Sequence, residues 1–478
     1  MNRDAGLARL KEDHFEILVV GGGATGLGCA LDAASRGYRT ALIEGNDFAS
    51  ATSSRSTKLV HGGVRYLRQG NVALVREALL ERARLLRNAP GLVRELPFLL
   101  PVFAWWQLPY YATGLRIYDA LARGKDVPRS TFCRAADAND LFPSLNATAL
   151  RGALVYWDAQ FDDARLAIAL AQSAVDCGAA IANYVRAETP IYEGSRVRGV
   201  TAIDCERDER FEIRARAVIN ATGIFADRLR LQDAPDAAPL LRFSRGSHIV
   251  IPSQTLPIAG TALLVPRTSD GRVLFVLPWH SSALIGTTDV ASPEAQFEPQ
   301  PTQGEIDYLL ETVNRYIDRP LQRTDIRSAF AGLRPLVNRA AARTARLSRE
   351  HIVEVAASGL VTVTGGKWTT YRKMAQDATD AACESAGLTA TECRTQSLRL
   401  HDVPLVPDLD YAVEHEMART LDDLLARRRR TLFIDARAAR ELAPRAAAIL
   451  ARRLNREPKW QEEQLQRFEA LATRYTVS

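Results

Sequence analysis

Apolar and polar positions at the start of the chain predict a strand, a helix and a second strand. The apolar run Phe15–Val20 is typical of a strand buried on both faces. The next apolar positions, in residues 27–37, follow a helical period and end at Gly37, a residue that commonly terminates helices. A second strand then runs to Glu44. The pattern predicts a βαβ unit.

A glycine-rich turn joins the first strand to this helix. Gly21, Gly23 and Gly26 form a GxGxxG motif in residues 21–26, with Ala24 and Thr25 inside it. These glycines permit a tight turn, a close approach to pyrophosphate, and packing of helix on strand. The helix N-terminus offers free N–H groups to the anion. Glu44 ends the second strand, where its carboxylate can accept hydrogen bonds from ribose hydroxyls and would repel a 2′-phosphate. We predict a dinucleotide site that disfavours NADP.

Two later segments favour FAD over NAD. After Glu44 the chain enters a hydroxyl-rich loop, residues 45–67, where a nicotinamide-binding domain would continue into a helix. Residues 214–227 read as a strand that ends in Ala221, Thr222 and Gly223, which is a recurrent feature of two-dinucleotide-fold flavoproteins. We therefore expect FAD as the cofactor.

The remaining patterns divide the chain into three regions. Alternating segments such as GSHIVIP and GRVLFVLPW predict an antiparallel substrate sheet. Residues 411–430 and 436–455 have apolar positions at helical period. The fold class is therefore α/β (α+β). It combines a discontinuous FAD domain (15–90, 151–235, 330–389), an inserted substrate domain (91–150, 236–329) and a C-terminal helical domain (394–478).

Composition and charge narrow the class of protein. The 478 residues, 47% hydrophobic and 25% charged, are typical of a globular protein with two or three domains. A net charge of +6 suits anionic small molecules or an anionic membrane surface, and no aromatic-interleaved basic stripe indicates nucleic acid. Six scattered cysteines without a CxxC pair suit neither a zinc site nor a disulfide framework. We expect no metal and a reducing cytosol.

Two segments raise the question of membranes. The charged N-terminus and the absence of an 18-residue apolar run predict neither a secretory signal nor a membrane span. The aromatic-rich residues 96–111, interrupted by three prolines, are either a buried part of the substrate domain or an interfacial membrane contact. The run Arg427–Arg430 either complements the dipole at a helix C-terminus or contacts anionic lipid.

The stretch GGKWTTYRKMA, residues 365–375, looks at first like a triphosphate loop. A Walker loop needs glycine where Val361 stands and Ser or Thr where Trp368 stands. A triphosphate loop is therefore excluded. We expect Gly365 and Gly366 to let the backbone lie close to the flavin ring, with Lys367 facing the reacting pair.

Taken together, the motifs resemble the FAD-dependent glycerol-3-phosphate dehydrogenase family of the aerobic, quinone-linked type. They occur in the expected order as VGGGATGLGCALDAASRG, TSSRSTKLVHGGVRYL, YWDAQFDDARL, GSHIVIP, FVLPWHSSALIGTTD, AGLRPL and GGKWTTYRKMA. The chain departs from the family pattern at Leu27, at His280 and at Ile224-Phe225, where Pro-Trp is usual.

The resemblance implies oxidation of sn-glycerol 3-phosphate to dihydroxyacetone phosphate, with electrons passed to a membrane quinone. It also implies a cytoplasmic protein bound peripherally at the inner face of the membrane, and it allows a homodimer. The expected cofactor contacts are Gly21, Gly23, Ala24, Thr25, Gly26, Glu44, Thr52, Ser53, Ser56, Leu59, His61, Ala221, Thr222, Gly223, Gly332, Gly366, Lys367, Trp368 and Thr369.

The same reaction needs a cationic phosphate pocket and a base. Arginine suits a phosphate because its planar fork matches the phosphate oxygens and keeps its charge. The candidate catalytic and substrate residues are His61, Arg65, Tyr66, His248, Arg334, Arg349 and Lys367. Either histidine could be the base, and the IGTTD segment is either a turn near the substrate or a purely structural turn.

Three alternatives stay open at this point. An oxidase of the same family would use oxygen instead of quinone. An amine or amino-acid oxidase shares the fold, although a carboxylate substrate explains the cationic candidates less well. A flavin-binding scaffold without turnover is the alternative from outside the enzymes.

Overall fold

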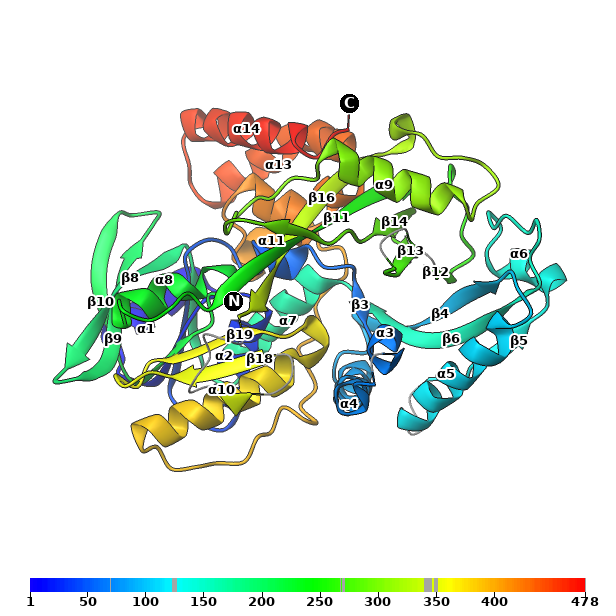
Figure 1. The fold of residues 1–478 in the computed structure, drawn as a ribbon. Helices are drawn as coiled ribbons and strands as arrows, with labels where there is room; N and C mark the ends of the chain where they lie inside the picture. Colours follow the sequence, from blue (N-terminus) through cyan, green and yellow to red (C-terminus); the bar gives the residue numbers. More distant parts are fainter. Residues whose placement is uncertain are drawn as a thin grey trace.

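The computed structural model describes residues 1–68, 70–122, 127–266, 268, 271–338, 346–347 and 351–477; within these ranges the side chains of Arg65, Arg68, Arg346 and Leu347 are not described. Two β-sheets lie side by side with helices on their outer faces, and the C-terminal helices lie above their junction (Figure 1).

The first sheet contains the predicted βαβ unit. Its strands, in order across the sheet, are β17 (Arg346–Leu347), β18 (His351–Val355), β19 (Val361–Gly365), β10 (Glu209–Asn220), β1 (Phe15–Val20), β2 (Thr40–Glu44) and β7 (Ala180–Asn183). The central strand β1 runs parallel to β10 and β2, as the prediction requires. β8 (Val185–Glu193) and β9 (Arg196–Asp204) extend β10 as an antiparallel ribbon.

Both faces of β1 are buried because its apolar run faces two different layers. Ile17 and Val19 pack against α2 (Ala24–Ser35), α7 (Asp163–Asp176) and α10 (Tyr371–Ala386). Leu18 and Val20 pack against α1 (Arg3–Glu12), the β8–β9 ribbon and α8 (Ala226–Asp233). This burial explains why the strand carries no alternating polar positions.

The second sheet is mostly antiparallel. Its strands, in order, are β15 (Val290–Ser292), β11 (Leu241–Pro252), β14 (Ser282–Gly286), β13 (Leu274–Trp279), β12 (Ala262–Val265), β4 (Val93–Val102), β6 (Gly152–Phe161) and β3 (Leu59–Val60). β16 (Ser328–Val337) pairs with β11, and β5 (Thr131–Cys133) pairs with β6. β12 and β4 run parallel. β6 and β16 therefore belong to this sheet, although their residues fall largely in ranges that we assigned to the FAD domain, and the domain division stays a prediction.

Alternation along β11 supplies both faces of the second sheet. Ile249 and Ile251 pack against α9 (Gln303–Asn314) on one face. Val250 lies in the core on the other face, which includes residues of the C-terminal helices. Further helices are α3 (Val64–Arg68), α4 (Val72–Asn88), α5 (Gln107–Leu121) and α6 (Ala138–Leu141).

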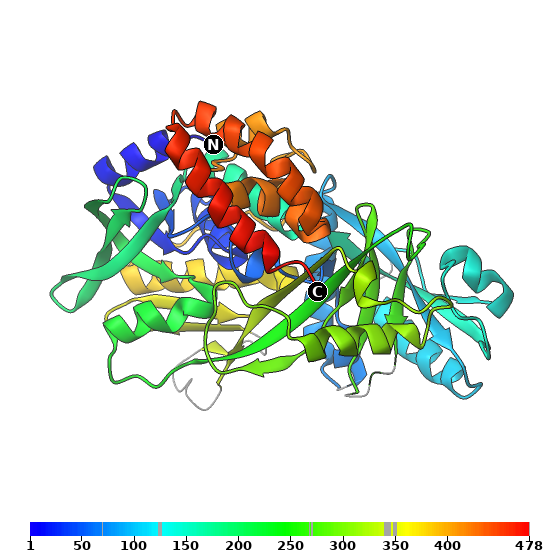
Figure 2. The same ribbon diagram turned by 90° about the horizontal axis from the view of Figure 1, so that it is seen from above.

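The C-terminal region is helical, as predicted, but it is less regular than expected. Its helices are α11 (Leu409–His415), α12 (Thr431–Ile434), α13 (Ala436–Arg453) and α14 (Pro458–Thr473), seen in orange and red in Figure 2. α13 matches the second predicted helix, whereas the first predicted helix, residues 411–430, is broken. A wide helical turn covers only Asp423–Arg428. The break allows Asp423 to accept the backbone N–H groups of Arg419 and Thr420.

The arginine run that follows is not a surface feature. Arg427, Arg428 and Arg430 are at most 3% exposed. Arg427 and Arg428 both bind Asp47, and Arg430 binds Asp163, so each pairs with a carboxylate far away in the sequence. The interpretation of this run as a lipid contact is therefore wrong for these three residues.

The aromatic segment 96–111 has a buried part and an exposed part, so its burial is confirmed for the first part and the membrane contact stays a prediction for the second. Its first part lies in β4, where Phe98 and Leu99 are fully buried. Its second part reaches the surface, where Trp105 is 65% and Trp106 60% exposed. Within the described ranges, no helix is both long enough and apolar enough to cross a bilayer.

Candidate active site

The glycine-rich turn has the geometry of a pyrophosphate site. Gly21 has a φ of +112°, which other residues rarely adopt. A Cβ on Gly26 would lie 1.8 Å from the carbonyl oxygen of Gly21, so only glycine allows this packing of α2 on the turn. Gly23 is the N-cap of α2, and Ala24 and Thr25 form its first turn. The turn fits the phosphate end of a dinucleotide.

Glu44 lies beside this turn, at the end of β2. Its two carboxylate oxygens accept the N–H groups of Gly22 at 2.6 Å and Asn46 at 2.8 Å. Burial raises the pKa of Glu44, and the two backbone donors oppose the rise. The fixed carboxylate suits a ribose hydroxyl. The backbone of Ala221 also reaches the turn: its N–H donates to Val20 at 2.9 Å, ahead of Thr222 and Gly223.

A cavity of about 1290 Å³ is lined by strands of the second sheet, by α3 and α5, and by the segment that follows β19. The expected site residues that line it are Thr52, Ser56, Leu59, His61, Tyr66, His248, Gly332, Arg334, Gly366, Lys367, Trp368 and Thr369. The expected residues outside its lining are those of the glycine-rich turn, Glu44, Ser53 and Ala221–Gly223. Arg349 lies outside the described residues, and the backbone of Arg65 is in α3.

Ser53 connects the glycine-rich turn to the cavity. Its hydroxyl accepts the N–H of Ala24 at 3.0 Å, and its carbonyl accepts the indole N–H of Trp368 at 2.9 Å. A long cofactor with its pyrophosphate at the turn can therefore reach the cavity along the hydroxyl-rich loop. The residues present fit FAD.

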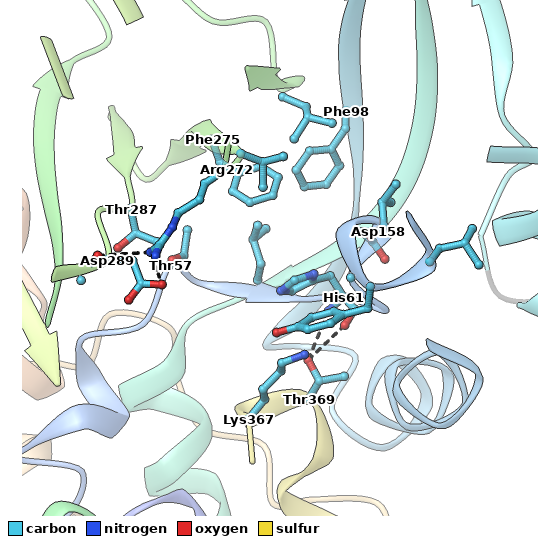
Figure 3. A pocket seen from close by; sticks show the side chains of 18 of the residues that line it. Thr57, His61, Phe98, Asp158, Arg272, Phe275, Thr287, Asp289, Lys367 and Thr369 are labelled. Atoms are coloured by element: carbon cyan, nitrogen blue, oxygen red, sulfur yellow. Dashed lines mark hydrogen bonds and ion pairs between the residues drawn. The ribbon is translucent and has the colours of Figure 1, made fainter. Parts of the chain in front are cut away.

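The GGKWTT segment forms one wall of this cavity. Gly365 and Gly366 both adopt positive φ, +81° and +68°, which turns the backbone before Lys367. A short 3₁₀ turn, Trp368–Thr370, leads into α10. Lys367 Nζ lies 3.9 Å from the centroid of the Tyr66 ring, and Thr369 Oγ1 accepts the N–H of His61 at 3.2 Å. Figure 3 shows Lys367 and Thr369 next to His61.

His248 is a buried titratable group in the cavity wall. It lies on β11, is 2% exposed, and stacks on Phe330 with ring centroids 5.0 Å apart. Its Nε2 is hydrogen-bonded to Thr57 Oγ1 at 3.0 Å. Burial, with smaller contributions from the charges of Lys58 and Arg334, lowers the pKa of His248 well below 6.5. The ring is therefore neutral at pH 7 and can accept a proton.

His61 is less enclosed than His248. It is half-buried, and its ring meets the edge of Phe275 at a centroid distance of 6.4 Å. It lines the same cavity, so the structure brings both predicted histidines to one site.

Arg334 extends from β16 to the opposite wall. Its guanidinium donates to Thr287 Oγ1 at 3.0 Å and to the carbonyl of Thr288 at 3.3 Å. Asp289 lies 3.7 Å from it. The IGTTD segment therefore lies at the cavity wall, where it orients Arg334.

Sequence reasoning missed three further charged residues that line the cavity. Arg272 forms an ion pair with Asp289, and Arg55 with Glu298 (Figure 3 shows the first pair). Asp158 is 2% exposed and accepts the hydroxyl of Tyr118 and a guanidinium N–H of Arg82. All three stand inside or beside segments already noted, and a charged residue within such a segment is the signal that could have identified them.

The departures from the family pattern lie away from the cavity lining. Ile224 is buried, and Arg228 stacks on the Phe225 ring at 4.5 Å. Leu27 is fully buried in α2, and His280 Nε2 lies 3.6 Å from Asp162. Among the described residues, no group of three His, Cys, Asp or Glu side chains could hold a metal ion.

Comparison with known proteins identifies the family of this chain. The model of the FAD-dependent oxidoreductase family matches residues 16–372, and that of the C-terminal domain of alpha-glycerophosphate oxidase matches residues 344–464. The human mitochondrial glycerol-3-phosphate dehydrogenase is 39% identical over 542 residues, 97% of this chain and 74% of that protein. The chain belongs to the FAD-dependent glycerol-3-phosphate dehydrogenase family.

Solved structures place this family member in a wider fold group. The glycerol-3-phosphate dehydrogenase of Bacillus halodurans, solved with FAD, matches with a TM-score of 0.82 and 28% identity, over 99% of this chain and 97% of that one. The glycine oxidase of Bacillus cereus matches with a TM-score of 0.58 and 19% identity, over 82% and 100%. The second likeness shows the fold alone, so fold does not separate the polyol-phosphate reaction from amine oxidation.

Proposed function

We propose that this dehydrogenase family member oxidises sn-glycerol 3-phosphate to dihydroxyacetone phosphate and passes the electrons to a membrane quinone. One observation carries the proposal. A single cavity combines a neutral buried imidazole, His248, with the cationic side chains of Lys367 and Arg334. Oxidation of a phosphorylated alcohol requires both a proton acceptor and a site for the phosphate.

The phosphate site in this proposal centres on Arg334. Its guanidinium is oriented by Thr287 and Thr288, and its side chain is 37% exposed and lines the cavity, so it can still bind a phosphate oxygen. Arg272 lines the same cavity. Arg65 and Arg349, whose side chains the structure does not describe, remain candidates for the same phosphate.

The proton acceptor in this proposal is His248, with His61 as the second candidate. Bound FAD supplies the two-electron acceptor for the reaction. His248 takes the hydroxyl proton of the substrate because its ring is neutral and held by Thr57. Lys367 provides positive charge on the neighbouring wall, where it stabilises the substrate oxygen as its proton leaves.

Exposed aromatic residues support peripheral membrane binding, for which we propose the cytoplasmic face. Trp106 and Tyr110 line the cavity and are 60% and 53% exposed, with Trp105 beside them. Trp and Tyr favour the headgroup zone of membranes. A membrane at this position would bring a quinone to the cavity. A homodimer stays a prediction.

A steady-state assay with a substrate panel tests the proposed reaction. The FAD-loaded protein is assayed with a redox dye and either sn-glycerol 3-phosphate, glycerol, glycine or proline. We expect turnover with glycerol 3-phosphate and much less with the others, because only that substrate has both the carbinol and the phosphate. Preference for an amino acid would replace the proposed function with amine oxidation.

The acceptor is tested by reoxidation of the reduced protein. We expect a soluble quinone analogue to reoxidise it faster than oxygen does at equal concentration. Faster reoxidation by oxygen, with release of peroxide, would make the protein an oxidase instead.

A further inference from the structure

The C-terminal segment Arg430–Phe433 reaches the ring of Phe330, which stacks on His248. Phe433 is fully buried, and its ring meets the edge of Phe330 with centroids 4.7 Å apart at 72°. Phe330 in turn stacks on His248 at 5.0 Å and 16°. The Phe330 ring is thus held between His248 and the C-terminal helix α12.

A second set of contacts links the same segment to the partner of His248. Arg430 donates to the carbonyl of Ser54 and to Asp163 Oδ1, both at 3.0 Å. Asp163 Oδ2 accepts the N–H and the hydroxyl of Ser56, at 3.0 and 2.7 Å. The next residue, Thr57, is hydrogen-bonded to His248 Nε2.

Lys58, the residue after Thr57, also binds Asp163 and Ser54. Its ammonium is fully buried and donates to Asp163 Oδ2 at 2.6 Å and to the carbonyl of Ser54 at 2.8 Å. Residues 54–58 are therefore wrapped around the carboxylate of Asp163. Arg430 holds that carboxylate, and its guanidinium also lies over the Phe433 ring at 4.5 Å.

We propose that Phe433 and Arg430 are positioning residues for His248, Phe433 through the ring of Phe330 and Arg430 through the Ser54–Lys58 loop. Neither residue lines the cavity, so both act on the reaction through other side chains. This role rests on the proposed function, in which His248 accepts the substrate proton.

The physical reason is the precision that proton transfer requires. A ring with one hydrogen bond and one stacking partner keeps its direction only while that partner is fixed. Shortening Phe433 would leave space beside Phe330, and both rings could then tilt. Arg334 lies on the same strand as Phe330 but is oriented by Thr287 and Thr288, so phosphate binding should change little.

The test compares two Phe→Leu variants of the holoenzyme. Phe433→Leu loosens the ring chain, whereas Phe468→Leu makes the same change in α14, within the same buried C-terminal core. Flavin reduction by glycerol 3-phosphate is measured by anaerobic stopped flow. Thermal midpoints and the ¹⁵N imidazole resonances of His248 are recorded in parallel.

We expect Phe433→Leu to lower the limiting reduction rate by roughly tenfold while the half-saturating substrate concentration stays within about twofold. The His248 resonances should shift in this variant only, and Phe468→Leu should reduce at the wild-type rate. Equal rates for the two variants, or a loss confined to half-saturation, would overturn the proposal. If Phe433→Leu does not fold, the pair Phe433→Met and Phe468→Met makes the same comparison with a better-filled core.

The two proposals can fail separately. A wild-type protein that glycerol 3-phosphate does not reduce would refute the proposed function. The His248 resonances need no substrate, and an unshifted spectrum in Phe433→Leu would refute the positioning role even then.

Discussion

Two properties of His248 bear on its proposed role: its ring is neutral, and its direction is fixed. Its surroundings disfavour the charged ring, because burial and the nearby cations Lys58 and Arg334 lower its pKa. Its direction is set by Thr57 and Phe330. The sequence could mark this histidine only through a motif, since the residues that produce both properties come from two segments far from it in the chain, Thr57–Lys58 and strand β16.

The pH dependence of flavin reduction follows from the neutral ring. The pKa of His248 lies well below 6.5, so the ring remains a proton acceptor throughout the neutral range. We expect the limiting rate of flavin reduction to change by less than about twofold between about pH 8 and about pH 6.5. Stopped-flow measurement at saturating glycerol 3-phosphate checks this, and a steep fall beginning near pH 7 would show a base with an ordinary imidazole pKa.

The lowered pKa of His248 also makes the free energy of unfolding depend on pH. The unfolded chain binds a proton on this ring near pH 6.5, whereas the folded protein does not. The free energy of unfolding therefore falls as the pH drops through about 6.5, by up to about 1.4 kcal/mol per pH unit. In His248→Gln, the slope of the melting temperature against pH should be smaller over this range.

Arg334 offers a residue-scale test of the phosphate site. We expect Arg334→Ala to raise the KM for glycerol 3-phosphate by about 10- to 100-fold, the value of one charge-assisted contact, with FAD still bound. The KM of Arg334→Lys should lie between those of the wild type and Arg334→Ala, because lysine keeps the positive charge but lacks the planar guanidinium. Arg440→Ala, which removes a surface ion pair with Glu469, serves as the control. An unchanged KM would remove Arg334 from the phosphate site.

At the scale of helices and strands, sequence patterns predicted those elements that depend only on neighbouring residues. The β1–α2–β2 unit follows from an apolar run, glycines at fixed spacing and a glycine stop, and the structure confirms it. The prediction of a continuous helix over residues 411–430 was wrong. Asp423 accepts backbone N–H groups there, and Arg427 and Arg428 bind the distant Asp47. Helical periodicity contains no information about such a partner.

Helix α5 and the turn before it carry the prediction for membrane association. Trp105 is 65% exposed, has Arg151 Cζ 5.9 Å from its ring centroid and does not line the cavity. We expect Trp105→Ser to weaken binding to anionic lipid vesicles by up to about tenfold, since one large apolar side chain would leave the interface. Dye-linked turnover should stay at the wild-type level.

The control for this measurement is Tyr192→Ser, an exposed aromatic residue on the β8–β9 ribbon. Vesicle co-sedimentation of both variants gives the comparison. Equal binding by the two variants would place the membrane contact, if there is one, at another surface.

At the scale of the whole molecule, the cavity is assembled from strands of the second sheet, from α3 and α5, and from the GGKWTT segment that follows β19. The fold class and the FAD-binding family could be predicted because ordered motifs extend along nearly the whole chain. The pairing of β6 and β16 with the second sheet could not, because both are apolar strands that either sheet could accept. The packing of Phe433 against Phe330 could not be predicted either, because the two residues are far apart in the sequence.

The central claim is that this cavity oxidises glycerol 3-phosphate with bound FAD. Anaerobic titration of the yellow holoenzyme, followed by the flavin absorbance, tests it most directly. We predict that sn-glycerol 3-phosphate bleaches the flavin and yields one dihydroxyacetone phosphate for each flavin reduced, while glycerol at the same concentration does not. A flavin that stays oxidised with glycerol 3-phosphate but is bleached by another polyol or by an amino acid would contradict the claim.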